Sequence, residues 1–190
     1  VDRMRTELGV EAVMGKPKVS FREAFGNPIE LVFTHKKQSG GSGQFAEVKM
    51  VFEPGEPGSG IEFADEIVGG RIPREYIPSV EHAVRVESRK GQVAGYEVVD
   101  FKARLLDGKF HDVDSSALAF EIAGKGAFRE AHRGSKPKLL EPIMGVEVVT
   151  ESEFLGDIIG DMNRRRGTIS EQGQKGLQSF VQGFVPLSEM

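Results

Sequence analysis

The sequence predicts an α+β fold built from two consecutive units. Three observations support this prediction. Several segments alternate apolar and polar residues, as half-buried strands do, and longer segments carry apolar residues at helical spacing. The pattern of strands and helices also starts again after residue 138. A chain of 190 residues has the length of one large domain or of two small ones.

The N-terminal segment is expected to belong to a neighbouring part of a longer protein. Residues 1–8 are predicted to form the end of a helix that stops at Gly9, and 10–13 a short strand. This piece is too short to bury a core of its own. The first residue is Val1 and not Met, so we expect a longer chain upstream.

The first unit is predicted to be rich in strands. The alternation is clearest in 45–53 and 96–106, where apolar residues recur at every second position and charged residues often lie between them. Runs of glycine, serine and proline at 38–44 and 54–60 interrupt the strand pattern and predict loops. The predicted strands cover 19–25, 29–37, 45–53, 61–65 and 96–106.

Two helices are predicted in the same unit. The first begins near Pro78, since proline suits the first helical turn, and is expected to end at Gly91. The second covers about 116–133, and Asp114 or Ser115 would cap its N-terminus. Its contact face is expected to consist of the apolar residues Phe120, Ala123, Ala127 and Ala131, with Gly124 and Gly126 allowing close backbone approach.

The second unit is expected to follow a linker over 135–138. A strand over 145–149 leads into a helix over 152–164, with Thr150 and Glu153 as a capping box. Two further strands are predicted over 167–172 and 177–186. The order strand, helix, strand, strand is three quarters of a split β-α-β sandwich, so we expect one face of its sheet to lie open.

No catalytic or metal site is predicted. The chain has no cysteine, which excludes disulfides, iron–sulfur clusters, thiolate zinc sites and cysteine nucleophiles. His111, Asp112 and Asp114 resemble a fragment of a metal site, but one histidine with two aspartates on a loop favours an ordinary polar loop. The sequence contains no P-loop motif, nucleophile elbow or long apolar run. The net charge of −4 argues against nucleic-acid binding through bulk charge, although local basic patches are compatible with it.

Two loops and two basic clusters are candidates for contact with RNA. Loop 38–44 has the composition of a flexible hairpin end, yet small residues next to Lys36 and Lys37 also suit close approach to an RNA backbone. Each of the loops 38–44 and 107–115 lies at one end of a strand, and the two loops would share one end of the unit if these strands lie side by side. Each basic cluster lies near the C-terminus of a predicted helix, where positive charges are favourable in any protein. The same charges could instead contact RNA phosphates. They comprise Arg129, His132, Arg133, Lys136 and Lys138 in one case and Arg164, Arg165 and Arg166 in the other.

The same segments resemble elongation factor G, a translational GTPase family of bacteria and organelles. The resemblance covers essentially the whole chain in the family's order. The motifs are Gln38–Gln44 and His111–Ser116 for the two loops at the end of domain IV, Gly69–Pro78 and Ala94–Asp100 as further signatures, and Leu140–Met144 and Gly160–Gly167 for domain V.

The resemblance implies a C-terminal fragment with three parts. Residues 1–15 would be the tail of domain III, 16–137 domain IV, and 138–190 part of domain V. For domain IV it implies a ribosomal-protein-S5-domain-2-like fold, which has a split β-α-β core with a left-handed crossover. For domain V it implies a truncated ferredoxin-like fold.

The resemblance also implies contact with the ribosome. In this family, domain IV reaches the decoding site in the 16S-type rRNA and follows the A-site tRNA–mRNA during translocation. Domain V faces large-subunit rRNA near the GTPase-associated centre. We expect no enzyme activity and no cofactor in this fragment, because GTP and magnesium belong to the absent N-terminal domain. We further expect a monomer without membrane contact, in the bacterial cytoplasm or an organellar matrix.

Two alternatives remain open at this point. A ribosome recycling or ribosomal protection factor of the same superfamily shares these domains. A stand-alone RNA-binding module is the other alternative, against which Val1 and the helix end at 1–8 argue.

The resemblance assigns RNA contact mainly to the two loops. Ser42 stands where the family often has arginine, and Lys36 and Lys37 would partly replace that charge. The expected rRNA or tRNA contacts are Lys36, Lys37, Gln38, Ser39, Gly40, Gly41, Ser42, Gly43, Gln44, Asp107, Gly108, His111 and Asp112, with His111 acting through hydrogen bonds. Further expected rRNA contacts are Arg133, Lys136, Arg164, Arg165 and Arg166.

Overall fold

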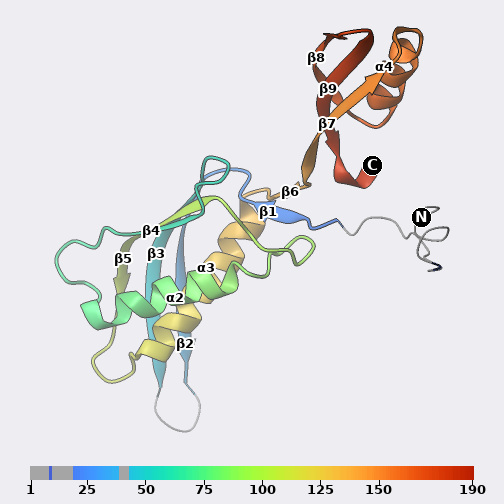
Figure 1. The fold of residues 1–190 in the computed structure, drawn as a ribbon. Helices are drawn as coiled ribbons and strands as arrows, with labels where there is room; N and C mark the ends of the chain where they lie inside the picture. The colour runs from blue at the N-terminus through green and yellow to red at the C-terminus, as the bar shows by residue number, and fades with distance from the viewer. Residues whose placement is uncertain (1–8, 10–18, 39–42) are drawn as a thin grey trace. The chain divides into compact units, whose positions relative to one another are not determined.

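The computed structural model describes residue 9 and residues 19–38 and 43–190. The helix expected over 1–8, the strand expected over 10–13 and most of the expected domain III tail lie outside these residues. The chain divides into two compact units, of which one is Phe21–Leu140 and the other contains Glu141–Met190 (Figure 1). The boundaries expected at 16 and 138 stay predictions.

A four-stranded sheet forms the first unit, in the order β2-β3-β5-β4. Strands β4 and β5 run parallel, and the other neighbours are antiparallel. Helices α2 and α3 pack against each other and lie on one face of this sheet (Figure 1). The elements are β2 (Ile29–Lys37), β3 (Gln44–Pro54), β4 (Ile61–Asp65), the short 3-10 helix η1 (Arg74–Tyr76), α2 (Ile77–Glu87), β5 (Phe101–Lys109) and α3 (Ala117–Gly134).

Aromatic rings fill the core between the sheet and α3. The ring centroid of Phe25 lies 5.5 Å from that of Phe52, 5.2 Å from that of Phe101 and 5.7 Å from that of Phe128. All four rings are buried, and burial of such a side chain contributes about 1.5–3 kcal/mol to folding. The predicted stripe of α3 is confirmed, because Phe120, Ala123, Ala127 and Ala131 are all fully buried.

The two glycines of α3 allow the expected close approach. A Cβ on Gly124 would lie 3.0 Å from the Cβ of Ala83 on α2, and one on Gly126 would clash with the ring of Phe33 on β2. The absence of side chains at these positions therefore sets the distance of α3 from both neighbours.

The strand predicted over 96–106 is shifted in the structure to 101–109. It cannot begin earlier because Asp100 has a φ of 53°, and its carboxylate and carbonyl oxygens accept hydrogen bonds from the N–H groups of Gly60 and Gly55. It extends further because Gly108 fits opposite Val48, where a Cβ would meet the side chain of Ile72. Gly108 is therefore a strand residue and not a loop residue.

Both predicted helix ends need correction. Helix α2 ends at Glu87 with Ser88 as its C-cap, and Gly91 instead leaves space for the carboxylate of Glu23. Ser116 caps α3, since its hydroxyl accepts a hydrogen bond from the N–H of Ala119 at 3.1 Å.

The segment predicted as a linker is part of the first unit. Ser135 is buried and its hydroxyl donates to the carbonyl of His132 at 2.8 Å. Lys138 begins β6 (Lys138–Leu140), which pairs antiparallel with β1 (Arg22–Ala24). The predicted first strand over 19–25 is thus reduced to these three residues of β1.

The second unit has the predicted order of elements. Strands β7 (Ile143–Thr150), β8 (Thr168–Lys175) and β9 (Gln178–Pro186) form an antiparallel sheet in the order β7-β9-β8. Helix α4 (Leu155–Arg164) follows the 3-10 turn η2 (Ser152–Phe154) and packs on this sheet, and η3 (Leu187–Glu189) comes last. The capping box is wrong: Thr150 belongs to β7, and the η2–α4 segment has no side-chain cap.

Within the residues that the structure describes, no helix combines the length and the apolar character that a bilayer span requires.

Candidate nucleic-acid interface

The loop between β2 and β3 and the loop between β5 and α3 meet at one end of the first sheet. The N–H of Phe45 donates to the carbonyl of Asp114 at 2.8 Å. A Cβ on Gly43 would lie 2.7 Å from the Asp114 carboxylate, so the two loops are in direct contact. We call the surface formed by 36–38, 43–45 and 110–116 the tip. Ser39, Gly40, Gly41 and Ser42, which the sequence assigns to RNA contact, lie outside the described residues.

His111 occupies the second loop of the tip and lies flat against Phe45. The two ring centroids are 3.7 Å apart and the ring planes differ by 3°. His111 is nevertheless exposed, so one ring face is covered while the rest of the ring is accessible. The sequence identified His111 but gave no sign of Phe45 as its partner.

A single hydroxyl group connects the second loop to β3. Ser115 accepts a hydrogen bond from the N–H of His111 at 2.9 Å and donates to the carbonyl of Phe45 at 2.7 Å. The N–H of Ser115 also donates to the carbonyl of His111 at 3.0 Å. Ser115 therefore closes the turn that carries His111 and is not the helix cap that the sequence suggested.

The β2–β3 hairpin places two lysines beside this stack. Lys36 and Lys37 end β2 and are both exposed, and consecutive strand residues point to opposite faces of a sheet. Lys37 pairs with Gln44, whose amide oxygen lies 2.9 Å from Nε2 of His35. Gln44 is thus held by a neighbour, while the two ammonium groups extend into solvent.

Two residues expected in the second loop lie in β5 instead. Asp107 accepts hydrogen bonds from Arg71 at 2.7 Å and from the N–H of Gly108 at 2.8 Å. Gly108 is buried opposite Val48. The structure therefore places neither residue on the exposed tip, whereas Asp112 lies in the turn and is exposed.

Lys109 is a further cation near the tip that sequence reasoning missed. It is the last residue of β5, its side chain is exposed, and its ammonium group lies 2.8 Å from the Glu47 carboxylate. The hydrogen bond from Lys109 lowers the pKa of Glu47 and so strengthens the pairing of the two charges. Because Lys109 follows a glycine in a segment predicted as a loop, nothing in the sequence indicated that it lies opposite Glu47 in the sheet.

The basic cluster at the C-terminus of α3 is smaller than its sequence suggests. His132 is fully buried. Arg129 makes two hydrogen bonds to Glu87, at 2.6 and 3.1 Å. Arg133 and Lys136 are exposed and remain candidates for phosphate contact.

The three arginines after α4 differ strongly from one another. Arg165 donates to Asp161 and to the carbonyl of Glu189, each at 2.7 Å. Arg166 makes two hydrogen bonds to Glu141, which lower the pKa of that carboxyl. The Arg164 side chain is 82% exposed and reaches Asp161 only at 3.8 Å. Arg164 is therefore the most accessible of the three for an external phosphate.

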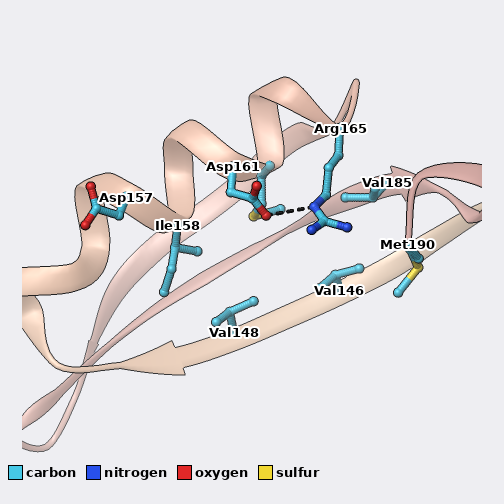
Figure 2. Close-up of a pocket in the computed structure, with 9 residues that line it drawn as sticks. Val146, Val148, Asp157, Ile158, Asp161, Arg165, Val185 and Met190 are labelled. Atoms are coloured by element: carbon cyan, nitrogen blue, oxygen red, sulfur yellow. Dashed lines mark hydrogen bonds and ion pairs between the residues drawn. The ribbon is translucent and has the colours of Figure 1, made fainter.

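The hollow between α4 and the sheet of the second unit does not suit RNA. It has a volume of about 520 Å³ and is lined mainly by apolar side chains, including Val146 and Val148 of β7 (Figure 2). At its rim, Arg165 is already paired with Asp161 (Figure 2). Across the described part of the chain, no group of three or more histidine and carboxylate side chains could hold a metal ion.

Known proteins match the chain over both units. Residues 17–136 match the family model described as elongation factor G, domain IV, and residues 138–190 match the model of the elongation factor G C-terminus.

Curated relatives and a solved structure agree with these matches. Proteins named elongation factor G from Granulibacter bethesdensis and Jannaschia sp. are each 54% identical over the whole chain, and one from Hyphomonas neptunium is 52% identical. The chain spans 27% of the length of these relatives. A crystal structure of a protein from Thermus thermophilus matches 99% of this chain and 28% of its own, with a TM-score of 0.79 and 39% identity.

Proposed function

The chain belongs to the elongation factor G family, and from this premise we propose that it is the ribosome-contacting part of a translation elongation factor. The tip would enter the decoding site of the small ribosomal subunit and contact 16S-type rRNA and the A-site tRNA–mRNA during translocation. The second unit would face large-subunit rRNA near the GTPase-associated centre.

The junction of the two loops is the observation that carries this proposal. It gathers His111, Lys36 and Lys37 at one end of a sheet whose core is filled with aromatic rings. Lysine side chains bind phosphate oxygens through charge, and exposed aromatic or imidazole rings stack on bases or hydrogen-bond to them. A support with a well-packed core can hold such groups in a fixed arrangement within a narrow RNA site.

The acidic net charge fits a contact confined to a few groups. The chain carries a formal net charge of −4, so a large basic face is not what would attract it to RNA. Lys36 and Lys37 supply positive charge where the loops meet, and Arg164 supplies it in the second unit. With positive charge at only these places, the chain would be brought to the RNA by the rest of the longer protein. The local phosphate contacts would then form once the tip is in position.

The remaining properties of the proposed factor concern the longer protein. GTP and magnesium would bind in a part of the relatives that this chain does not cover, so we assign no catalytic step to the chain itself. We propose that the protein acts as a monomer in the bacterial cytoplasm, as the bacterial relatives suggest, and makes no membrane contact.

A test of this function needs a full-length protein that contains the chain. We would replace the matching 190 residues of the Granulibacter bethesdensis protein with this chain and introduce Lys36→Ala with Lys37→Ala. The measurements are the single-round translocation rate, the ribosome-stimulated GTP hydrolysis rate and the salt dependence of ribosome binding. Translocation should slow and the salt slope should fall by about one for each lysine that contacts phosphate, while GTP hydrolysis stays unchanged.

The matched control is Lys90→Ala, which removes an exposed lysine elsewhere in the same unit. It should leave translocation unchanged. Equal effects from both substitutions, or an undisturbed translocation rate in the double variant, would contradict the proposed role of the tip. In a parallel assay of ribosomal subunit splitting, a loss of splitting with normal translocation would favour the recycling factor instead.

A further inference from the structure

Two residues behind His111 organise the part of the tip that would meet RNA. We infer that Phe45 and Ser115 are positioning residues, which act through His111 and fix its imidazole ring in one orientation for contact with a nucleobase or ribose. The inference rests on the proposed function and adds to it two uncharged residues to which the sequence assigned no role in RNA contact.

The stack with Phe45 restricts what His111 can do. At a centroid distance of 3.7 Å and an interplanar angle of 3°, the phenyl ring covers one entire face of the imidazole. A ligand can then reach only the opposite face and the ring edge. Phe45 is itself the second residue of β3, and its side chain is partly buried, so the ring that supports His111 is anchored in the sheet.

The backbone of His111 is fixed independently of its ring. Its N–H and its carbonyl are both hydrogen-bonded to Ser115, at 2.9 and 3.0 Å. Ser115 in turn donates to the carbonyl of Phe45 at 2.7 Å, and the N–H of Phe45 donates to Asp114 at 2.8 Å. The main chain of His111 and the ring that supports its side chain are therefore both tied to the start of β3.

Such prior ordering strengthens binding without any new contact. A histidine on a loose turn would lose rotational freedom on meeting RNA, and that loss would weaken the interaction. Because the turn and the ring are already ordered in the folded protein, this loss of conformational entropy does not weaken binding. Phe45 and Ser115 should thus matter for translocation only as long as His111 is present.

The experiment is a double-mutant cycle in the same full-length chimera. Phe45→Leu and Ser115→Ala are each introduced alone and together with His111→Ala, and the single-round translocation rate is measured. Phe45→Tyr keeps the stack and Ser115→Thr keeps the hydroxyl, so both serve as rescue variants. Loss of an aromatic contact corresponds to a rate reduction of about three- to tenfold, and we expect that range for Phe45→Leu.

The expected result is that His111→Ala alone slows translocation and that neither Phe45→Leu nor Ser115→Ala slows the His111→Ala protein further. The rescue variants should translocate at close to the parent rate. Additive losses in the cycle would show that Phe45 and Ser115 act independently of His111, and a normal rate for His111→Ala would equally overturn the inference. In either case, slow translocation after Lys36→Ala with Lys37→Ala would leave the proposed function standing.

A second measurement reads the ring position directly in the 190-residue chain. The ring current of a stacked phenyl group shifts the His111 carbon-bound protons upfield in a nuclear magnetic resonance spectrum. The shift should be present in the parent and in Phe45→Tyr and absent in Phe45→Leu, with the rest of the spectrum of the first unit preserved. Unshifted protons in the parent chain would refute the stack and the inference with it.

Discussion

The first unit buries a continuous cluster of side chains around Phe25, Phe52, Phe101 and Phe128, whereas the buried core described for the second unit consists of Met162, Val181 and Val185. Exposed ion pairs occur in both units, such as Arg85 with Glu81 in the first and Arg166 with Glu141 in the second, so they do not distinguish the two. Exposed ion pairs contribute little to folding compared with buried apolar side chains. The difference indicates that the unit carrying the tip is the more rigid of the two.

The largest effect should come from the aromatic cluster. Phe128→Ala removes a buried ring that contacts three other phenylalanines, and it should lower the unfolding free energy of the first unit by about 3–5 kcal/mol. Tyrosine fluorescence during urea unfolding is a suitable measurement, because both tyrosines of the chain, Tyr76 and Tyr96, lie in this unit. A loss below about 1 kcal/mol would contradict the view that this core determines the stability of the unit.

A second, smaller effect concerns a buried carboxylate. Glu23 is fully buried and accepts hydrogen bonds from the N–H groups of Val93, Ala94 and Tyr96 at 2.8–3.1 Å. Glu23→Gln would place an amide N–H₂ group against at least one of these donors and would remove the negative charge, and we expect a loss of about 2–3 kcal/mol in the same fluorescence assay. A neutral result would show that the loop 91–96 is held by other contacts.

The same carboxylate predicts how the stability of the first unit depends on pH. Burial alone would raise the pKa of Glu23, but the three backbone donors and nearby His132 lower it overall. Burial lowers the pKa of His132, whose ring is fully buried and whose Nδ1 accepts a hydrogen bond from Gln92 at 3.3 Å. Both shifts stabilise the fold at neutral pH, and this stabilisation is lost as protons bind.

Stability should therefore fall on acidification in two stages. The contribution of His132 declines below the pKa of an unfolded histidine, about 6.5, and that of Glu23 declines below the pKa of an unfolded glutamate, about 4.5. Urea titrations between about pH 7 and pH 2.5 would measure this. In Glu23→Gln the second stage should become smaller, while the lowered pKa values of Glu47, Glu66 and Glu121 leave a remainder. A protein equally stable at both ends of this range would refute the argument.

The smallest of these effects should come from the second unit. Val181→Ala removes two buried methyl groups from β9, and we expect a loss of about 1–2 kcal/mol, followed through backbone amide signals of residues 143–186 during urea unfolding. Phe128→Ala in the first unit serves as the comparison. If the Val181 substitution costs as much as the Phe128 substitution, the contrast between the two cores does not hold.

The parts of the fold that depend on repeating patterns could be predicted from the sequence. The stripe of α3 and the alternation in β3 were recovered because each buried position repeats at a regular interval. Single positions were missed where tertiary contact decides the outcome. Asp100 adopts a positive φ because Gly55 and Gly60 bind to it, and Glu23 looks like a solvent-facing residue of a short strand although three N–H groups surround it.

At the tip, too, the general arrangement could be predicted from the sequence and the individual tertiary contacts could not. The sequence placed the two loops at one end of the sheet only if their strands lie side by side. The structure meets this condition, because β3, which follows the first loop, pairs with β5, which precedes the second. The stack of His111 on Phe45 could not be foreseen, because no local pattern links a strand residue to a loop residue so far along the chain. The assignment of these residues to RNA contact remains a prediction.

The pairing of β1 with β6 has a mechanical consequence. Arg22 lies opposite Leu140, so the chain enters and leaves the first unit at the same end of a two-stranded ribbon. A pulling force applied between residues 21 and 141 would load the ribbon in the unzipping direction, and its residue pairs would separate one after another. Under tension, β1 and β6 would then separate before the aromatic core of the first unit begins to unfold.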